Sequence, residues 1–298
     1  GSFTFTNELF APLLSVVCIN DLEQGIEYAN SSEYGLTAGL QSLDENEIEI
    51  WRNSIEAGNL YINRGITGAI VNRQPFGGMK RSAFGGGIKA GGPNYVSCFV
   101  EFTEGQTLSV TEKSPLADLV TDEKDKARLS YAWGSNKQAW ITEFSQERDV
   151  NNLYGEENIF RYLPLKNIGL RVQESDSLTD ILLILSAVKI TTTPLIISLS
   201  GNDSKLHAIE KAASLLLGIV IKIQEENNFI EEMHQYERIR TCSANLSDAI
   251  YEKAAKLGKH IASSKPLVEG RLELLHYLKE QSIAHEYHRY GSIFGEDK

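Results

Sequence analysis

Cysteine, long apolar runs and positive charge are all scarce in this sequence of 298 residues. The three cysteines, Cys18, Cys98 and Cys242, are widely spaced and form no CxxC pair, which disfavours a disulfide framework and a zinc cluster. No apolar run approaches the roughly 20 residues that span a bilayer, and the first residues lack a signal-peptide pattern. We therefore expect a cytoplasmic protein without a membrane span.

Acidic residues outnumber basic ones by 40 to 29, which gives a formal net charge of −11. Nucleic-acid grooves and anionic membrane surfaces require clustered lysine and arginine, so this balance argues against both as partners. A hydrophobic content of 42% is typical of proteins that form a core, and the length suffices for two domains. The leading Gly1-Ser2 pair resembles a cloning remnant, so we expect a piece of a longer protein.

The first hundred residues alternate strand-like and helical patterns, the rhythm of a parallel α/β sheet. Apolar runs predict strands, and amphipathic spacing with acidic caps predicts helices. The expected strands cover residues 13–19, 36–42 and 59–64, and the expected helices cover residues 21–32 and 44–58.

A glycine-rich stretch follows at residues 66–95, but its spacing matches neither GxxxxGK[ST] nor GxGxxG before a helix. Phosphate binding is therefore weakly supported. Gly68 and Ala69 could instead present successive backbone N–H groups to a carboxylate. The alternative is a loop shaped only by tight turns.

Alternating apolar and polar residues at 95–103 predict an exposed strand that pairs with a partner, and hence a homo-oligomer. The next region, residues 104–160, is polar and acidic, with a helix expected at 122–146. We expect it to be a helical connector between a first domain at 1–103 and a last domain at 161–298.

Residues 161–298 show a second α/β rhythm that favours a doubly wound, Rossmann-like domain. The turn after its first strand, "VQESDSLTD", has no glycine through which a pyrophosphate could approach a helix. Glu174 and Asp176 would repel phosphate there, so we expect the nucleotide-binding shape without the nucleotide. Near the end, His285 and His288 could meet on one helical face as a metal pair, but no third ligand is nearby, and we expect no metal site.

Four segments resemble the C-terminal part of the aldehyde dehydrogenase superfamily: "NELFAPLLSV", "YGLTAGLQS", "AGNLYINR" and "QPFGGMKRSAFG". Within it, "TGAIVNRQPFGG" and "GGIKAGGPNYV" resemble the glutamate-γ-semialdehyde (1-pyrroline-5-carboxylate) dehydrogenase branch, which includes bifunctional proline utilisation proteins. "FRYLP" and the segment from "GRLELLHYLKEQ" to "EYHRYG" resemble the extra C-terminal domain of longer members. The resemblance implies an α/β fold, with the C-terminal part of a catalytic domain followed by a Rossmann-like domain.

The resemblance also implies roles for particular residues. Glu8 would accept hydrogen bonds from the nicotinamide ribose of NAD, and Phe10 would back the nicotinamide, although Ala11 stands where glycine is more usual. The substrate that the resemblance implies would be a small carboxylated aldehyde. Its α-carboxylate would be held by the backbone of Gly68 and Ala69, with Thr67 as a hydroxyl donor, and Phe76 would pack on its aliphatic stem.

Family catalysis uses a cysteine nucleophile, which the resemblance places upstream of "NELFAP". We expect Cys18, Cys98 and Cys242 to be buried or structural thiols, so no catalytic residue is assigned. The implied parent is an NAD-dependent dehydrogenase that oxidises L-glutamate γ-semialdehyde to glutamate, with FAD possible in an upstream proline dehydrogenase domain, and the fragment is expected to be inactive. Two alternatives stay open: an assembly or lid module, and an aldehyde dehydrogenase with another substrate.

Overall fold

The computed structural model describes residues 3–83, 85–105, 109–110, 112–216 and 218–287. The chain divides into two compact units. The first unit comprises Gly1–Phe99, Glu147–Arg161 and Glu280–Lys298, and the second comprises Val100–Gln146 and Tyr162–Lys279. Each unit is therefore built from separate stretches of the chain. The domain boundaries at residues 103 and 160 stay a prediction.

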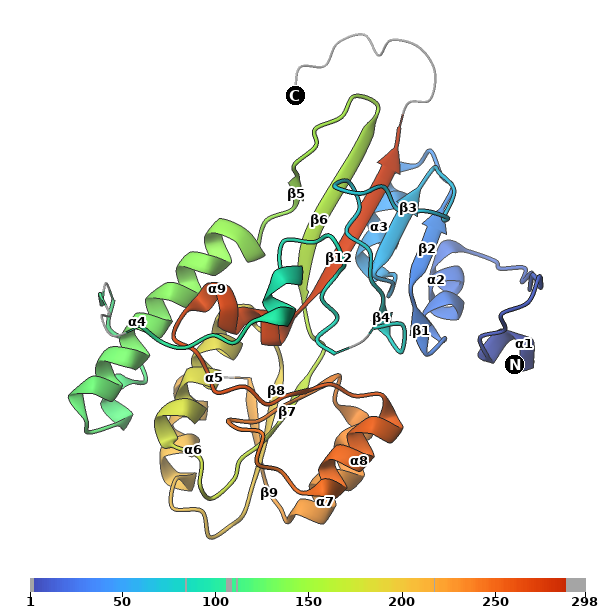
Figure 1. The fold of residues 1–298 in the computed structure, drawn as a ribbon. Coiled ribbons are helices and arrows are strands. Elements are labelled where there is room, and N and C mark those ends of the chain that lie inside the picture. Colours follow the sequence, from blue (N-terminus) through green and yellow to red (C-terminus); the bar gives the residue numbers. More distant parts are fainter. Residues whose placement is uncertain (1–2, 84, 106–108, 111, 217, 288–298) are drawn as a thin grey trace. The chain divides into compact units, whose positions relative to one another are not determined.

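The first unit is built on a five-stranded mixed sheet of order β2-β3-β12-β6-β5 (Figure 1). β3 pairs in parallel with both β2 and β12, whereas β5 and β6 are antiparallel. The unit boundaries fall within β6 and β12. The elements that lie at least partly in this unit are α1 (Phe3–Thr6), α2 (Leu22–Asn30), β1 (Tyr34–Gly35), β2 (Thr37–Leu40), α3 (Glu45–Ser54), β3 (Asn59–Ile62), β4 (Met79–Lys80), the 3₁₀ helix η1 (Tyr95–Phe99), β5 (Arg148–Asp149), β6 (Glu156–Pro164) and β12 (Leu278–Glu286).

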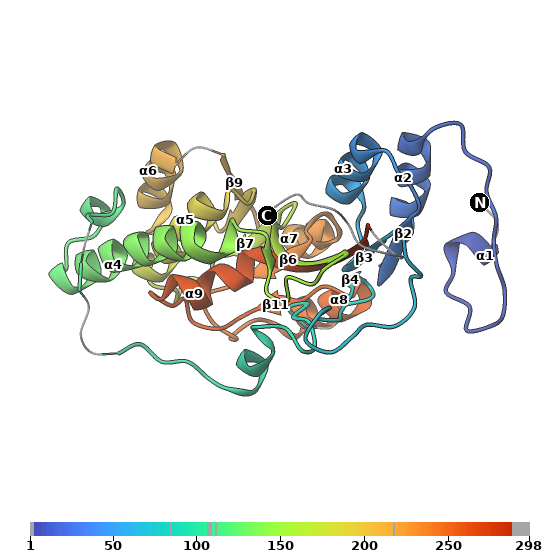
Figure 2. The same ribbon diagram turned by 90° about the horizontal axis from the view of Figure 1, so that it is seen from above.

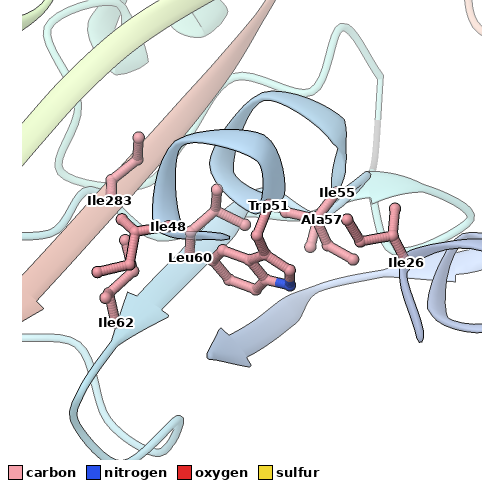
Figure 3. Close-up of a cluster of buried hydrophobic side chains, with 8 residues drawn as sticks. All are labelled: Ile26, Ile48, Trp51, Ile55, Ala57, Leu60, Ile62 and Ile283. Carbon is pink, nitrogen blue, oxygen red and sulfur yellow. The ribbon is translucent and has the colours of Figure 1, made fainter. Parts of the chain in front are cut away.

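The two helices α2 and α3 begin at the acidic residues that the sequence indicates. The Asp21 side chain accepts the backbone N–H of Gln24, and Asp44 caps α3 in the same way, so orphan N–H groups of each first turn are satisfied. The helices pack on β3 around Trp51, which is 5% exposed (Figure 3). The remaining buried side chains of this core are Ile26, Ile48, Ile55, Ala57, Leu60, Ile62 and Ile283.

Two strand predictions are wrong. Residues 13–19 form neither helix nor strand, and Leu14 and Val16 are largely exposed. Residues 95–99 form the 3₁₀ helix η1, and residues 100–103 have no regular structure. An apolar run becomes a strand only when a neighbouring strand takes up its backbone hydrogen bonds, and neither segment has such a neighbour among the described residues.

The cysteine and histidine expectations have mixed outcomes. Cys18 and Cys98 are exposed, so neither is the buried thiol that the sequence predicts. Cys242 is buried, as expected. His285 lies in the strand β12 and not in a helix, and His288 is outside the described residues. In the described part of the chain no helix combines the length and apolar character needed to cross a membrane.

The second unit contains a five-stranded, fully parallel sheet of order β11-β10-β7-β8-β9. β7 and β10 are neighbours at its centre, which is the strand order of a doubly wound dinucleotide-binding fold. Helices α5 and α6 lie on one side of this sheet and α7 and α8 on the other (Figure 1). The strands are β7 (Ile168–Arg171), β8 (Leu195–Leu199), β9 (Ile219–Ile223), β10 (Arg238–Arg240) and β11 (Ile261–Ala262).

The helices of the second unit follow the predicted rhythm. α4 packs against α5 and α9, and Figure 2 shows α4 and α5 side by side. The segment predicted as helical at 122–146 forms α4 and then one π-helical turn. The bounds are η2 (Ala117–Leu119), α4 (Glu123–Ala139), η3 (Trp140–Phe144), α5 (Leu178–Thr191), α6 (Leu206–Leu216), α7 (Glu226–Glu232), η4 (Met233–Gln235), α8 (Asp248–Leu257), α9 (Gly270–Glu273) and η5 (Leu274–Tyr277).

Candidate functional site

The loop that follows β3 holds the candidate anion-binding backbone. Thr67, Gly68 and Ala69 are exposed and irregular in structure. Gly68 has φ +80, and a Cβ added there would meet no atom within 4 Å, so the backbone conformation and not crowding makes glycine suitable. The N–H groups of Gly68 and Ala69 donate to no group in the described residues. They are therefore available to an anion from outside.

A buried amide fixes the base of this loop. Gln74 is only 4% exposed. Oε1 of its side chain accepts the backbone N–H of Ile70 at 2.9 Å. Its Nε2 donates to Oδ1 of Asn158, in β6, at 2.8 Å. Because both ends of the Gln74 amide are satisfied, the turn from Ile70 to Gln74 is anchored to the sheet. The N–H groups of the loop thus project from a fixed support.

Phe76 lies just beyond that turn and is half-buried. Its backbone pairs with Ala90 in an isolated antiparallel bridge, with N···O distances of 3.0 and 2.9 Å. The preceding carbonyl of Pro75 accepts the hydroxyl of Ser282, in β12, at 2.6 Å. The glycine-rich stretch is therefore a folded hairpin-like segment attached to the sheet. Phe76, which is expected to pack on the aliphatic stem of the substrate, and the proposed anchor residues therefore lie on either side of the turn from Ile70 to Gln74.

A buried lysine lies beneath the glycine-rich segment. Lys89 is 0% exposed, and its Nζ donates to Oδ1 of Asn59 at 3.0 Å and to the carbonyl of Gly77. Burial lowers the pKa of Lys89 to about 7, although the nearby Glu280 carboxylate opposes that shift. A Cβ on Gly58 would overlap the same Gly77 carbonyl, so this close backbone approach requires glycine.

Glu280 completes this buried cluster from β12. Its Oε2 accepts the backbone N–H of Lys89 at 2.7 Å, and its Oε1 accepts from Nδ2 of Asn94 at 2.6 Å. Sequence reasoning missed both Lys89 and Glu280. The available signal was the lysine itself, alone among small and apolar residues in "GGGIKAGG", where a charged side chain is out of pattern.

The two residues expected to bind the cofactor are not part of this hydrogen-bonded cluster. Glu8 and Phe10 are exposed in an irregular segment, Phe10 to 98%. The carboxylate of Glu8 receives no hydrogen bond within the described part of the chain. By themselves these residues do not fit a bound dinucleotide, and no reaction step follows from them.

The thiols also lack the features of an activated nucleophile. Partial desolvation and the Glu280 charge raise the pKa of Cys98 although the residue is exposed, and burial and Asp176 raise the pKa of Cys242. Catalytic cysteines require the opposite shift, which a neighbouring cation or base supplies. Cys18 is in the exposed 13–19 segment. The described residues therefore offer a substrate-anchoring loop without an identified nucleophile.

Comparison with known proteins defines the class of this α/β chain. Residues 1–104 match the aldehyde dehydrogenase family, so this part of the chain belongs to that family. It is similar to the 1-pyrroline-5-carboxylate dehydrogenase of Bacillus subtilis (strain 168), with 46% identity over 89 residues, which are 30% of this chain and 17% of that protein. It is also similar to the bifunctional protein PutA of Escherichia coli (strain K12), with 34% identity over 197 residues, 60% of this chain and 15% of that protein.

The solved structure of proline utilization A (PutA) from Corynebacterium freiburgense matches the fold as well. Its TM-score is 0.76 at 37% identity, and the match covers 98% of this chain and 27% of that chain. The expected family and α/β class are thereby confirmed. This chain spans less than a third of the length of each of these three proteins.

Proposed function

We propose that this chain is part of an NAD-dependent dehydrogenase that oxidises L-glutamate γ-semialdehyde to glutamate in proline catabolism. The observation that carries the proposal is the pair of unbonded N–H groups at Gly68 and Ala69, on a loop anchored by the buried Gln74 amide. Similarity to a 1-pyrroline-5-carboxylate dehydrogenase over 89 residues supports the substrate class.

In this proposal each site residue has one task. The N–H groups of Gly68 and Ala69 bind the α-carboxylate of the substrate, and the hydroxyl of Thr67 adds a donor. Phe76 packs against the aliphatic stem, where a ring excludes water without competing for hydrogen bonds. Glu8 accepts from the ribose hydroxyls of NAD, and Phe10 packs beside the nicotinamide.

The chain supplies only part of that site. The apolar side chains of the 13–19 segment are exposed, which is unfavourable unless further protein covers them. Glu8 and Phe10 need opposing walls that the described residues do not provide. We therefore propose that the isolated chain is inactive and that the longer protein completes the site. An upstream FAD-dependent proline dehydrogenase domain belongs to the same proposal.

The substrate anchor is tested in the longer enzyme that contains this chain. Gly68→Val forces a β-branched residue into the left-handed region, so the anchor loop must change shape. We expect kcat/KM for glutamate semialdehyde to fall at least tenfold, with little change for an uncharged aldehyde of similar length. Gly65→Ala is the matched control, because a Cβ there meets no atom within 4 Å and its φ is not positive. Equal loss for both aldehydes would refute the carboxylate anchor.

The incompleteness of the site is tested with the isolated chain. NADH formation is measured with glutamate semialdehyde and NAD⁺, beside the longer enzyme as a positive control. We expect no turnover by the isolated chain. Turnover would show that the nucleophile lies within these 298 residues, and the Cys18→Ala, Cys98→Ala and Cys242→Ala variants would then identify it.

A role in assembly is supported by a separate observation. Although residues 95–103 are not a strand here, Val96 and Phe99 are 72% and 73% exposed. Apolar groups exposed together often mark a protein–protein interface. We propose that this segment contacts a second copy of the protein. Light scattering of Val96→Asp should then show a smaller oligomer than the unaltered protein, and an unchanged mass would contradict the assignment.

A further inference from the structure

A cavity of about 490 Å³ opens at one edge of the parallel sheet in the second unit. Its walls come from the loops that follow β7, β10 and β11, so three segments far apart in sequence meet there. All of its walls belong to the second unit. The side chains that matter for its chemistry are those of Asp176, Asp180, Cys242, Ser243, Ser263 and Lys265.

The sheet topology explains why a cavity forms at this place. From β7 the chain continues into α5 on one side of the sheet, and from β10 it continues into α8 on the other. Because these two strands are neighbours, their loops diverge and leave a crevice beyond their carboxyl ends. Doubly wound proteins bind their ligands in this crevice.

The lining disfavours the dinucleotide that such a crevice often binds. Asp176 is 9% exposed and Asp180 is 8% exposed, and both residues line the cavity. Oδ2 of Asp176 accepts the backbone N–H of Gln173 at 2.8 Å. Oδ1 of Asp180 lies 3.5 Å from the guanidinium of Arg128. Acidic side chains at this position disfavour a phosphate and favour a cation, although Arg128 already pairs with one oxygen of Asp180.

Positive and neutral donors occupy other walls of the same cavity. Lys265 is exposed, and the Ser243 and Ser263 hydroxyls are half-buried. In the described residues no group of three or more His, Cys, Asp or Glu side chains could hold a metal ion. The lining thus combines carboxyl groups with an ammonium group and hydroxyls, and its size suits a small molecule.

We propose that this cavity binds a free amino acid as a zwitterion, with its ammonium group at Asp176 and Asp180 and its carboxylate at Lys265 and the serine hydroxyls. The assignment concerns the second unit alone and goes beyond the proposed dehydrogenase function, whose substrate loop is in the first unit. The outcome of a binding test on this cavity is therefore independent of whether the Gly68 loop binds a carboxylate.

Isothermal titration calorimetry of the 298-residue chain tests the proposal. The probes are L-alanine, L-serine and L-glutamate, with ethylamine as the amine alone, acetate as the acid alone, and AMP as the nucleotide. We expect saturable binding of at least one amino acid, at least tenfold tighter than ethylamine or acetate. Absence of saturable binding by all three amino acids, or tighter binding of AMP, would overturn the proposal.

Two variants locate the binding site. Asp176→Asn should weaken the amino acid at least tenfold, whereas Glu174→Gln, at an exposed acid outside the cavity, should leave affinity unchanged. If circular dichroism shows that Asp176→Asn is unfolded, the affinity of Lys265→Met is measured in its place. That substitution changes an exposed side chain without disturbing the core. Unchanged affinity in a folded Asp176→Asn, or in Lys265→Met where that variant decides, would refute this location.

Discussion

Oε2 of Glu280 accepts the backbone N–H of Lys89 at 2.7 Å, although the two residues are 191 positions apart in sequence. The carboxylate thereby ties the glycine-rich segment to β12, and Asn94 adds a second bond to the other oxygen. The Lys89 ammonium group is directed elsewhere, to Asn59 and Gly77. This buried cluster supports the segment that carries Phe76, so its charges bear on the integrity of the candidate site.

The first prediction concerns the pH dependence that Lys89 produces. Burial lowers its pKa from 10.5 to about 7. Between those values the unfolded chain holds a proton that the folded chain lacks, so the free energy of unfolding rises with pH across this window. The shift corresponds to roughly 5 kcal/mol at most. Lys89→Met should remove most of this slope in urea unfolding measured from pH 7 to pH 10.

Lys113→Met serves as the control for that experiment. The Lys113 side chain is 66% exposed, so its removal should leave the slope of the unaltered protein in place. A Lys89→Met variant with the same pH slope as the unaltered protein would show that Lys89 has an ordinary pKa.

The second prediction concerns the core between α2, α3 and β3. Trp51 is 5% exposed and packs within the cluster of Figure 3. Trp51→Ala should reduce the free energy of unfolding by about 3–5 kcal/mol, because it loses apolar burial and leaves a cavity. Ile50→Ala, one residue away and 44% exposed, should change it by no more than about 0.5 kcal/mol. Similar losses for both variants in guanidinium unfolding would contradict this packing.

Local sequence patterns predicted the elements whose partners are near in the chain. β2, α3 and β3 follow one another, and both β2 and β3 have apolar side chains that face the Trp51 core. The second α/β rhythm expected from residue 161 onwards includes α5, β8, α6 and β9, which also follow one another in the chain. Asp21 and Asp44 indicated where their helices begin because capping depends on residues only two or three positions away.

Non-local pairing explains the elements that were not predicted. The segment 278–286 joins β3 in the first unit, and no nearby pattern indicates a partner so far along the chain. The 13–19 run has strand-like composition but no pairing strand in the described residues. The Lys89 cluster was missed for a related reason: hydrophobic periodicity identifies buried apolar faces and carries no information about buried charges.

The third prediction concerns a buried ion pair in the second unit. Nη2 of Arg240 lies 3.0 Å from Oε1 of Glu273, and their side chains are 0% and 1% exposed. Arg240→Met leaves that carboxylate without its charged partner and should cost about 3–5 kcal/mol in the free energy of unfolding. The double variant Arg240→Met/Glu273→Gln should recover part of this loss. The two side chains do not interact if Glu273→Gln lowers the free energy of unfolding by the same amount in Arg240→Met as in the unaltered protein.

The fourth prediction concerns loss of stability in acid, which His260 should produce in the second unit. Burial, reinforced by Arg238 and Arg240, lowers the pKa of His260 from 6.5 to about 4. Between these values the unfolded state binds the proton and the folded state does not, so the free energy of unfolding falls as pH falls from 6.5 to 4. The shift corresponds to roughly 3 kcal/mol.

His260→Gln should reduce this acid slope without abolishing it, because burial and the same two arginines also lower the pKa of His276. The control is His207→Gln, at a side chain 78% exposed, which should keep the slope of the unaltered protein. Urea unfolding at half-unit steps from pH 4 to pH 7 measures all three proteins. Equal slopes for His260→Gln and His207→Gln would mean that the imidazole at 260 titrates as it does in water, and that the arginines beside it are screened by solvent.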